Sequence, residues 1–332
     1  MLNLGIVGAG YIAGVMADTV RQLNATGNQE VRLYAIASRT KEKAEAFASK
    51  YGIEKAFSSY QELYEDERVD LVYIATPHSS HYEDAKNCLN HGKHVLCEKA
   101  FTVNAKQAEK LFSLAEEKKL LITEAIWTRY QPMRQIIKNE VDSGIIGQPM
   151  VLTGNLGFAI AGIKRLALPE LAGGALLDVG IYPLNFAEMV FGHPDAVEGS
   201  CVMTKAGVDL TDSMTLEWFE SGRMAVLNAS TAGISDQYGI IQGTTGFIVV
   251  DKVLNPQSLK VFDAERKLIK ELKCPPQLTG YEYEVIETCD CINRGLLECP
   301  SMPHSETIHM MNVMDSLRMQ FGLRYPHEIE KV

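Results

Sequence analysis

The stretch Gly8-Ala9-Gly10-Tyr11-Ile12-Ala13 decides the fold of this chain. It lies between an apolar, strand-like segment, residues 2–7, and a segment with the apolar spacing of a helix, residues 11–23. In this context Gly8 allows a tight turn, Gly10 lets the backbone approach a pyrophosphate, and the third, small position lets helix and strand pack closely. The helix N-terminus adds an anion site. We therefore predict dinucleotide contacts from Gly8, Gly10, Tyr11, Ile12 and Ala13.

Strand and helix patterns alternate beyond this turn. Further strands are expected at residues 31–37, 71–75, 94–97 and 120–124, with helical patterns between them, and this predicts a parallel, doubly wound sheet. After Gly147 the pattern changes to short strands joined by turns, including a hairpin at Gly243-Thr244-Thr245-Gly246, which predicts a mostly antiparallel sheet. The expected fold is α/β, with a Rossmann domain at residues 1–123 and an α/β domain for substrate binding and oligomerisation at residues 124–332.

Composition narrows the class of protein. A chain of 332 residues is long enough for two cores, and 46% hydrophobic with 22% charged residues is typical of a globular protein. The net charge of -10 disfavours nucleic acid as a partner. No apolar run reaches the roughly 20 residues that cross a bilayer, and no basic leader opens the chain, so we expect a cytoplasmic protein without membrane contact.

The seven cysteines are not spaced like a disulfide framework, so we expect reduced thiols. The Cys289-x-Cys291 pair, with Cys299 and His304 downstream, raises a zinc hypothesis. A second closely spaced pair is missing and the segment has a helical pattern, so core packing is preferred and no metal is expected.

The end of the second strand bears on the choice of dinucleotide. An NAD enzyme usually places Asp or Glu there for the ribose hydroxyls, whereas this chain has Ser38 and Arg39. A serine can bond to a 2′-phosphate, and an arginine can pair with it and stack on adenine. NADP is therefore the expected cofactor, with NAD as the alternative if Arg39 is only a solvated surface charge.

Two further segments carry candidate chemistry. Lys99 follows the strand at residues 94–97, at the carboxyl edge of a parallel sheet, where doubly wound folds bind ligands. Asp178 and Tyr182 are four residues apart and share a helical face if the helix begins there. Pro183 requires that start to lie close to Asp178, whose carboxylate would then cap the helix. In the simpler alternatives, Lys99 is a solvated charge, Asp178 only caps the helix and Tyr182 only packs against its neighbours.

Taken together, these segments resemble the glucose-fructose oxidoreductase and inositol dehydrogenase (Gfo/Idh/MocA) family over nearly the whole chain. The resemblance rests on the glycine turn, Ala37-Ser38-Arg39, the Glu98-Lys99 pair and the Asp178-x-x-x-Tyr182 segment. Residues 123–130 and 302–307 look most similar to the branch of dimeric dihydrodiol and xylose dehydrogenases. The chain departs from the family at Ala100, where a proline is usual, so a cis Glu-Lys-Pro geometry cannot be carried over.

The resemblance implies a catalytic pocket, and the chemistry of each side chain indicates its role there. The expected catalytic residues are Lys99, Tyr182, Asp178 and His81. A phenol is a poor base at neutral pH, but a neighbouring ammonium favours the phenolate, so Lys99 and Tyr182 can move the proton that hydride transfer requires. The expected cofactor set also includes Thr76, Pro77, Glu98 and Lys99, and the expected substrate set is Trp127, Arg129, Tyr130 and Phe158. For the aromatic pair at 127 and 130, packing is an equally good interpretation.

The predicted function is an NADP-dependent oxidoreductase acting on a sugar, polyol, dihydrodiol or small carbonyl compound. One alternative is a non-catalytic regulator that responds to NADP, and another is a reductase of a large conjugated ligand. We also expect a homodimer or larger assembly, because apolar residues such as Val226, Ile240 and Ile248 occur in the second sheet, whose outer face needs a cover.

Overall fold

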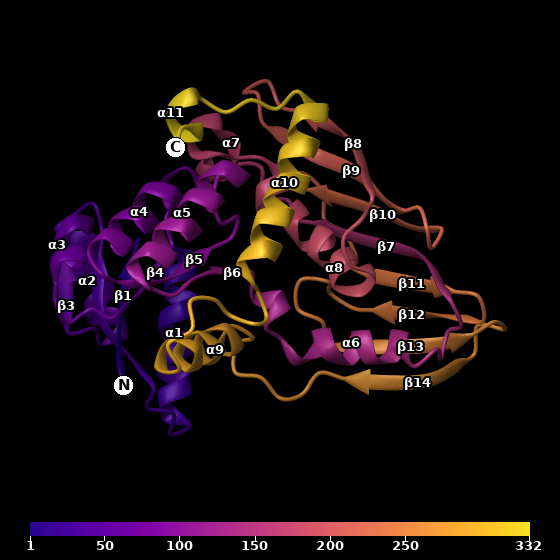
Figure 1. The fold of residues 1–332 in the computed structure, drawn as a ribbon, viewed down its shortest axis with the longest axis horizontal. Coiled ribbons are helices and arrows are strands. Elements are labelled where there is room, and N and C mark those ends of the chain that lie inside the picture. Colours follow the sequence, from indigo (N-terminus) through magenta and orange to yellow (C-terminus); the bar gives the residue numbers. More distant parts are fainter. The chain divides into compact units, whose positions relative to one another are not determined.

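The computed structural model describes all residues, 1–332, and forms two compact units (Figure 1). The first unit comprises residues 1–130, 277–308 and 330–332, and the second comprises residues 131–276 and 309–329. The predicted division at residue 123 was therefore wrong for the C-terminal part of the chain. Helix α9 (Glu282–Asn293) returns to the first unit because Val285 and Cys289 are buried in its core.

The first unit has the predicted parallel sheet. Its strands are β1 (Leu2–Val7), β2 (Val31–Ala37), β3 (Lys55–Phe57), β4 (Leu71–Ile74), β5 (His94–Glu98) and β6 (Ile122–Ala125). They lie in the order β3-β2-β1-β4-β5-β6, which is the Rossmann order, and every pair is parallel. The helices between them are α1 (Tyr11–Ala25), α2 (Lys41–Tyr51), α3 (Tyr60–Glu65), α4 (His78–Asn90) and α5 (Ala105–Lys118). All strands therefore end at one edge, where ligands of this fold bind.

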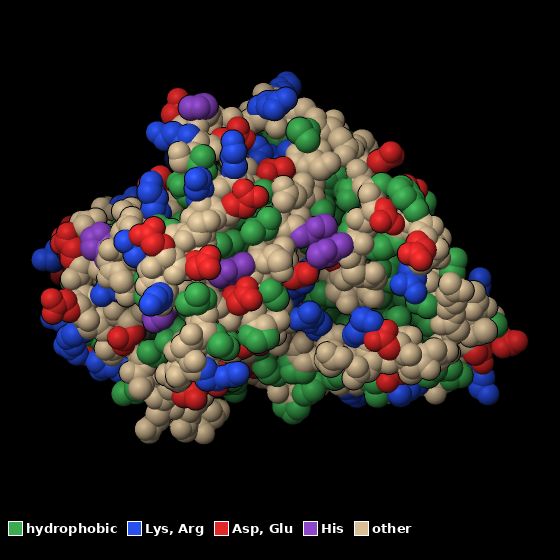
Figure 2. Space-filling model, in the orientation of Figure 1, with side chains coloured by type: hydrophobic (Ala, Val, Ile, Leu, Met, Phe, Trp, Pro, Cys, Tyr) green, Lys and Arg blue, Asp and Glu red, His purple; other side chains and the backbone are tan.

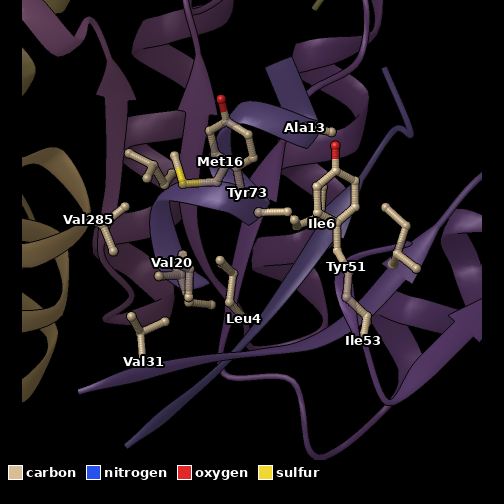
Figure 3. Close-up of a cluster of buried hydrophobic side chains, with 14 of the residues drawn as sticks. Leu4, Ile6, Ala13, Met16, Val20, Val31, Tyr51, Ile53, Tyr73 and Val285 are labelled. Atoms are coloured by element: carbon tan, nitrogen blue, oxygen red, sulfur yellow. The ribbon is translucent and has the colours of Figure 1, made fainter. Parts of the chain in front are cut away.

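The core of the first unit joins this sheet to its helices (Figure 3). Leu4 and Ile6 from β1 meet Met16 and Val20 from α1, and all four are essentially inaccessible to solvent. Each such side chain contributes about 1.5–3 kcal/mol by burial. This packing fixes α1 against β1, and so it fixes the turn between them.

The second unit contains one sheet of eight strands. These are β7 (Pro149–Gly157), β8 (Ala196–Met203), β9 (Asp209–Trp218), β10 (Arg223–Ser230), β11 (Gly239–Gly243), β12 (Gly246–Val250), β13 (Ser258–Asp263) and β14 (Leu268–Lys273). Their order is β14-β13-β12-β11-β7-β10-β9-β8, and only β7 and β10 pair in parallel. The helices that belong to this unit are α6 (Pro132–Asp142), α7 (Lys164–Ala167), α8 (Ile181–Phe191), most of α10 (His304–Phe321) and most of α11 (His327–Glu330). The mostly antiparallel sheet and its hairpin confirm the expected fold class.

Strand register corrects one residue of the expected apolar face. Val226 of β10 and Ile240 of β11 both pair with Thr153 of β7, so they lie on one face of the sheet. Ile248 pairs instead with Ile241, and both are fully buried on the opposite face. Val249, which pairs with Ile240, takes the place predicted for Ile248 because side chains alternate along a strand.

The distribution of surface charge, the polarity of the helices and the state of the cysteines agree with what the composition predicts. On the face drawn in Figure 2, acidic and basic side chains are interspersed, and neither sign forms a continuous patch. No helix is both long enough and apolar enough to pass through a bilayer. The seven cysteines are free thiols, and Cys289, Cys291 and Cys299 are buried, as core packing predicts.

Candidate active site

The glycine turn after β1 has the geometry of a phosphate cradle. Gly8 has φ +98°, and a Cβ there would lie 2.7 Å from the Ala75 carbonyl oxygen, so only glycine fits. Gly10 precedes α1 without a side-chain cap, and no protein atom lies within 4 Å of the position a Cβ would take. The first N–H groups of α1 therefore face open space, which suits a pyrophosphate. The residues present fit a bound dinucleotide.

Small residues also hold the base of this helix against its neighbours. Ala13 is completely buried, as its place in the fingerprint predicts. A Cβ on Gly14 would lie 2.6 Å from the Tyr51 hydroxyl of α2, so this position also needs glycine. The need for glycine at position 14 cannot be predicted from the local sequence, because its neighbour, Tyr51, comes from a different helix. Tyr11 and Ile12 are the first two residues of α1, so their backbone N–H groups have no partner within the helix and can bond to a ligand.

Ser38 and Arg39 lie directly beside the glycine turn. Val7 and Ala37 are partners in the β1–β2 pair, and the Gly8 N–H donates to the Ala37 carbonyl at 3.0 Å. Ser38 is buried, with its N–H bonded to the Phe57 carbonyl, whereas Arg39 is exposed. The first basic side chain after β2 therefore stands at the edge where a ribose would lie.

The loop after β4 passes against Gly8 and is held by buried side chains. The Thr76 hydroxyl donates to Asp84 at 2.7 Å, and Pro77 caps α4. Burial raises the pKa of Asp84 to about 6. His81 is fully buried, with Nδ1 2.8 Å from the Ala100 carbonyl oxygen and Nε2 2.9 Å from the Thr76 carbonyl oxygen.

These contacts favour a positioning role for His81. Both ring nitrogens face backbone carbonyls, and burial lowers its pKa, so the side chain is not presented to a substrate. It links the loop after β4 to the loop after β5. The catalytic role expected for His81 stays a prediction.

Lys99 follows β5 at the carboxyl edge of the sheet, as predicted. Its N–H donates to the Glu98 carboxylate at 3.2 Å, and the same carboxylate accepts from the Tyr73 hydroxyl of β4. The Lys99–Ala100 peptide is cis, although alanine stands where the family has proline. The Lys99 side chain is partly exposed, unlike its neighbours Glu98 and Ala100, so it is open to a ligand.

Glu124 supports this loop from β6. One carboxylate oxygen accepts from the Phe101 N–H at 3.1 Å and the other from the Thr307 hydroxyl at 3.1 Å. The side chain is 1% exposed, and this burial raises its pKa to about 7. Glu124 lay within a segment singled out from the sequence, but its role depends on partners at positions 101 and 307.

Two of the predicted substrate residues have structural contacts instead. Arg129 is 2% exposed and pairs with Glu306 at 2.8 Å. The Tyr130 hydroxyl lies 2.7 Å from the Thr123 hydroxyl and donates to the Glu124 carbonyl. These contacts favour a structural role for both residues, and their substrate role stays a prediction.

The other two predicted substrate residues, Trp127 and Phe158, differ in their surroundings. Trp127 stacks on Tyr281, with ring centroids 4.0 Å apart, so packing is the better interpretation for it too. Phe158, which follows β7 in the second unit, is only partly buried and stays a candidate.

Asp178 and Tyr182 occupy consecutive helical turns of the second unit. Asp178 lies in a π-helical turn, Leu176–Gly180, that runs directly into α8, where Tyr182 is the second residue. The Asp178 carboxylate pairs with Arg165 of α7, with Oδ1 2.5 Å from Nη1 and Oδ2 3.4 Å from Nη2. The prediction that Asp178 caps the helix was wrong, because the helical segment begins two residues earlier.

Asp209 provides the cap instead. Its Oδ2 accepts from the Leu176 N–H at 2.5 Å, and the side chain is 1% exposed at the start of β9. Gly174 has φ +117°, and a Cβ there would lie 1.9 Å from Asp209 Oδ1, which explains this glycine. Asp212 is also buried, and burial beside Asp209 raises its pKa well above the ordinary range. A protonated Asp212 lets the pair carry a single charge at the helix start.

Comparison with known proteins assigns the family. Residues 2–125 match the oxidoreductase family with an NAD-binding Rossmann fold, and residues 134–249 match the GFO/IDH/MocA C-terminal domain. The chain belongs to the Gfo/Idh/MocA family. The sequence-based resemblance is thereby confirmed over both halves of the chain.

Relatives within the family are similar over their full length. A trans-1,2-dihydrobenzene-1,2-diol dehydrogenase from Danio rerio is 34% identical, with 98% of this chain and 99% of the relative covered. The Homo sapiens protein of the same name is 30% identical with the same coverage.

Solved structures share the fold. A 3-ketoreductase from Actinomadura kijaniata in complex with NADP and TDP-benzene has a TM-score of 0.86 at 22% identity, with 96% of this chain and 98% of that chain covered. An aldose-aldose oxidoreductase from Caulobacter crescentus has a TM-score of 0.84 at 21% identity, with 96% and 97% covered.

Membership of the Gfo/Idh/MocA family establishes the class of activity. The chain is an oxidoreductase that acts on CH–OH groups and binds a nicotinamide dinucleotide through its Rossmann unit. The residues that sequence reasoning missed are Glu124, Arg165, Asp209 and Asp212. Glu124, Arg165 and Asp209 each act through a partner on another element, and Asp212 acts through Asp209 on the same strand.

The pKa of Glu124 predicts how stability depends on pH. Its pKa is raised from 4.5 to about 7, so between these values the folded protein holds a proton that the unfolded chain has lost. The free energy of unfolding should therefore fall as pH rises through this window, by on the order of 3 kcal/mol from this group. Glu124→Gln keeps an acceptor for the Phe101 N–H, and its NH2 can donate to the Thr307 hydroxyl, so it should keep both contacts and remove this share of the slope.

Chemical denaturation of both proteins at pH 5, 6, 7 and 8 (roughly spanning the window) measures the difference. Glu109→Gln, an exposed carboxylate on α5, is the matched control and should leave the slope unchanged. Parallel pH curves for the Glu124 variant and the unaltered protein would show that the carboxylate is ionised throughout.

Proposed function

We propose that this chain is an NADP-dependent dehydrogenase or reductase whose substrate is a dihydrodiol, sugar, polyol or small carbonyl compound. The observation that carries the proposal is the pairing of two features at one sheet edge: a phosphate cradle at Gly8 and Gly10, and a partly exposed Lys99 after β5. The relatives named as dihydrodiol dehydrogenases make a vicinal diol the first substrate to test.

The preference for NADP is supported by charge. Arg39 is exposed beside the glycine turn, and neither Ser38 nor Arg39 is an acid that would repel a 2′-phosphate. A guanidinium can form two hydrogen bonds with a phosphate and stack on adenine.

Proton handling is assigned to Lys99 and Tyr182. Bound NADP supplies the hydride acceptor or donor. Tyr182 takes the proton from the substrate hydroxyl or returns it to the carbonyl, and the Lys99 ammonium stabilises the charge on both oxygens. Asp178 is 4% exposed and pairs with Arg165, so we assign it to holding the helical turn that leads into Tyr182. His81 positions the backbone that follows Lys99.

A panel of alcohols with NADP⁺ tests the proposal. Trans-dihydrodiols, aldoses, inositols and simple alcohols are incubated with the protein, and reduced nicotinamide is followed by absorbance. We expect turnover with at least one vicinal diol or sugar. Binding of NADP without turnover on any of them would favour the non-catalytic regulator, which the enzyme names of the relatives do not support.

The outer face of the second sheet supports self-association. Val226 is 44% exposed in the middle of β10, and Met224 on the same strand is 36% exposed. Ile240 of β11 and Val249 of β12 lie on the same face, beyond Thr153 of β7, and with them these residues form a mostly apolar row that a second copy can cover.

We expect a dimer or larger assembly by light scattering at micromolar concentration, and we expect Val226→Asp to shift it toward monomer. Met319→Asp, at an exposed position of α10, is the control for a charge placed away from this face of the sheet. A monomer for the unaltered protein would remove this proposal.

A further inference from the structure

Three side chains that can bind a metal meet at the C-terminal end of α8. Glu188 lies in the last turns of α8, His193 follows the helix, and His309 comes from α10. His309 Nε2 is 3.2 Å from Glu188 Oε1, and the ligand atoms of all three lie within 4.8 Å of one another. All three residues belong to the second unit, and the proposed hydride transfer uses none of them.

The fold holds this group in place. The Glu188 side chain is fully buried, and its backbone carbonyl accepts from the Gly192 N–H at 2.8 Å. Gly192 has φ +79° and turns the chain out of the helix, while the Trp218 indole N–H donates to the Gly192 carbonyl at 3.2 Å. The backbone that leads to His193 is therefore fixed by β9.

The donor set is that of a zinc site. Two imidazoles and one carboxylate bind zinc in many proteins, with water in the fourth position. Bonds of about 2.0–2.1 Å place two tetrahedral ligands roughly 3.3 Å apart, and the His309–Glu188 separation of 3.2 Å matches this spacing. The carbonyls at the end of α8 add partial negative charge, which favours a cation.

One side chain has to turn when the ion binds. The rings of His193 and His309 stack with centroids 3.7 Å apart and planes 11° apart, so their lone pairs run parallel. A shared ion requires these lone pairs to converge. His193 is exposed, so its ring can rotate to another staggered position without disturbing the core.

We propose that Glu188, His193 and His309 bind one Zn²⁺ ion, with water as the fourth ligand. The ion joins the C-terminal end of α8 to α10. Because it binds the folded protein and not the separated ligands of the unfolded chain, it stabilises the second unit.

Calorimetric titration and thermal unfolding of the full chain test the site. The protein is treated with a chelator, dialysed and titrated with zinc chloride. We expect one ion per chain, a rise in the unfolding temperature on adding zinc, and with Co²⁺ the visible absorption of a tetrahedral site. His193→Ala alters an exposed residue and should fold normally, while its zinc affinity falls at least tenfold. His309→Ala should lose binding altogether.

His327→Ala, which removes an exposed histidine from α11, is the matched control and should bind zinc as the unaltered protein does. Two results would overturn the proposal. One is the absence of saturable zinc binding. The other is equal binding by His193→Ala and the unaltered protein, which would place the ion elsewhere, for example on the partly exposed thiols Cys201 and Cys274.

Discussion

Tyr182→Phe is expected to reduce turnover by a factor of about 10²–10⁴, because it removes the group proposed to move the substrate proton. Tyr182 is 7% exposed and lies in the first turn of α8, so loss of one hydroxyl should leave the fold intact. NADP affinity should change little, since the phenol is expected to contact substrate. Steady-state kinetics and a fluorescence titration with reduced cofactor measure the two effects separately.

A double-mutant cycle with Lys99→Met tests whether the two side chains act as one unit. Each single change should cost a large factor, and the double variant should lose little more than either one. Tyr238→Phe, which removes a partly exposed hydroxyl elsewhere in the second unit, is the control and should keep normal turnover. Near-normal turnover for Tyr182→Phe would contradict the assignment of proton transfer to Tyr182. If His81→Ala also lost turnover, the proton donor would be His81.

Arg39→Ala is expected to raise the Kd for reduced NADP by roughly 10–100-fold while leaving the Kd for reduced NAD nearly unchanged. A charge-assisted hydrogen bond to a phosphate contributes about 1.5–3 kcal/mol, which corresponds to this range. The measurement is a titration of both dinucleotides with both proteins. Lys41→Ala removes an exposed charge two residues away, at the start of α2, and serves as the control. An unchanged preference in the Arg39 variant would show that another group selects the dinucleotide.

Local patterns in the sequence were enough for most of the fold. The glycine turn, the alternation of strands and helices and the hairpin at residues 243–246 each depend on neighbours in the chain. The strands expected after Gly147 ended at residue 250, so β13 and β14 were both missed. Strand β14 lies at the sheet edge and its residues are mostly exposed, so it lacks an alternating pattern. Strand β3 was missed because three residues are too few to show one.

The site was less predictable, because its supporting contacts join distant residues. Lys99 and Arg39 could be placed from the ends of their strands, which topology alone brings to one edge. The capping of Leu176 by Asp209 joins residues 33 apart, and the contact of Glu124 with Thr307 joins residues 183 apart. The contacts of Arg129 and Tyr130 with Glu306, Thr123 and Glu124 could not be predicted either, because sequence position shows only that both residues follow the last strand of the parallel sheet.

Transfer of deuterium from the substrate tests whether the protein moves a hydride directly from the CH–OH carbon to NADP⁺. A vicinal diol or aldose that turns over in the substrate panel is prepared with deuterium on the reacting carbon and incubated with NADP⁺ and the protein. The reduced cofactor is then analysed by mass spectrometry and proton NMR. We expect the label to appear at C4 of the nicotinamide, and we expect Tyr182→Phe to slow its appearance in proportion to turnover. Reduced cofactor without the label would contradict direct hydride transfer from the CH–OH carbon.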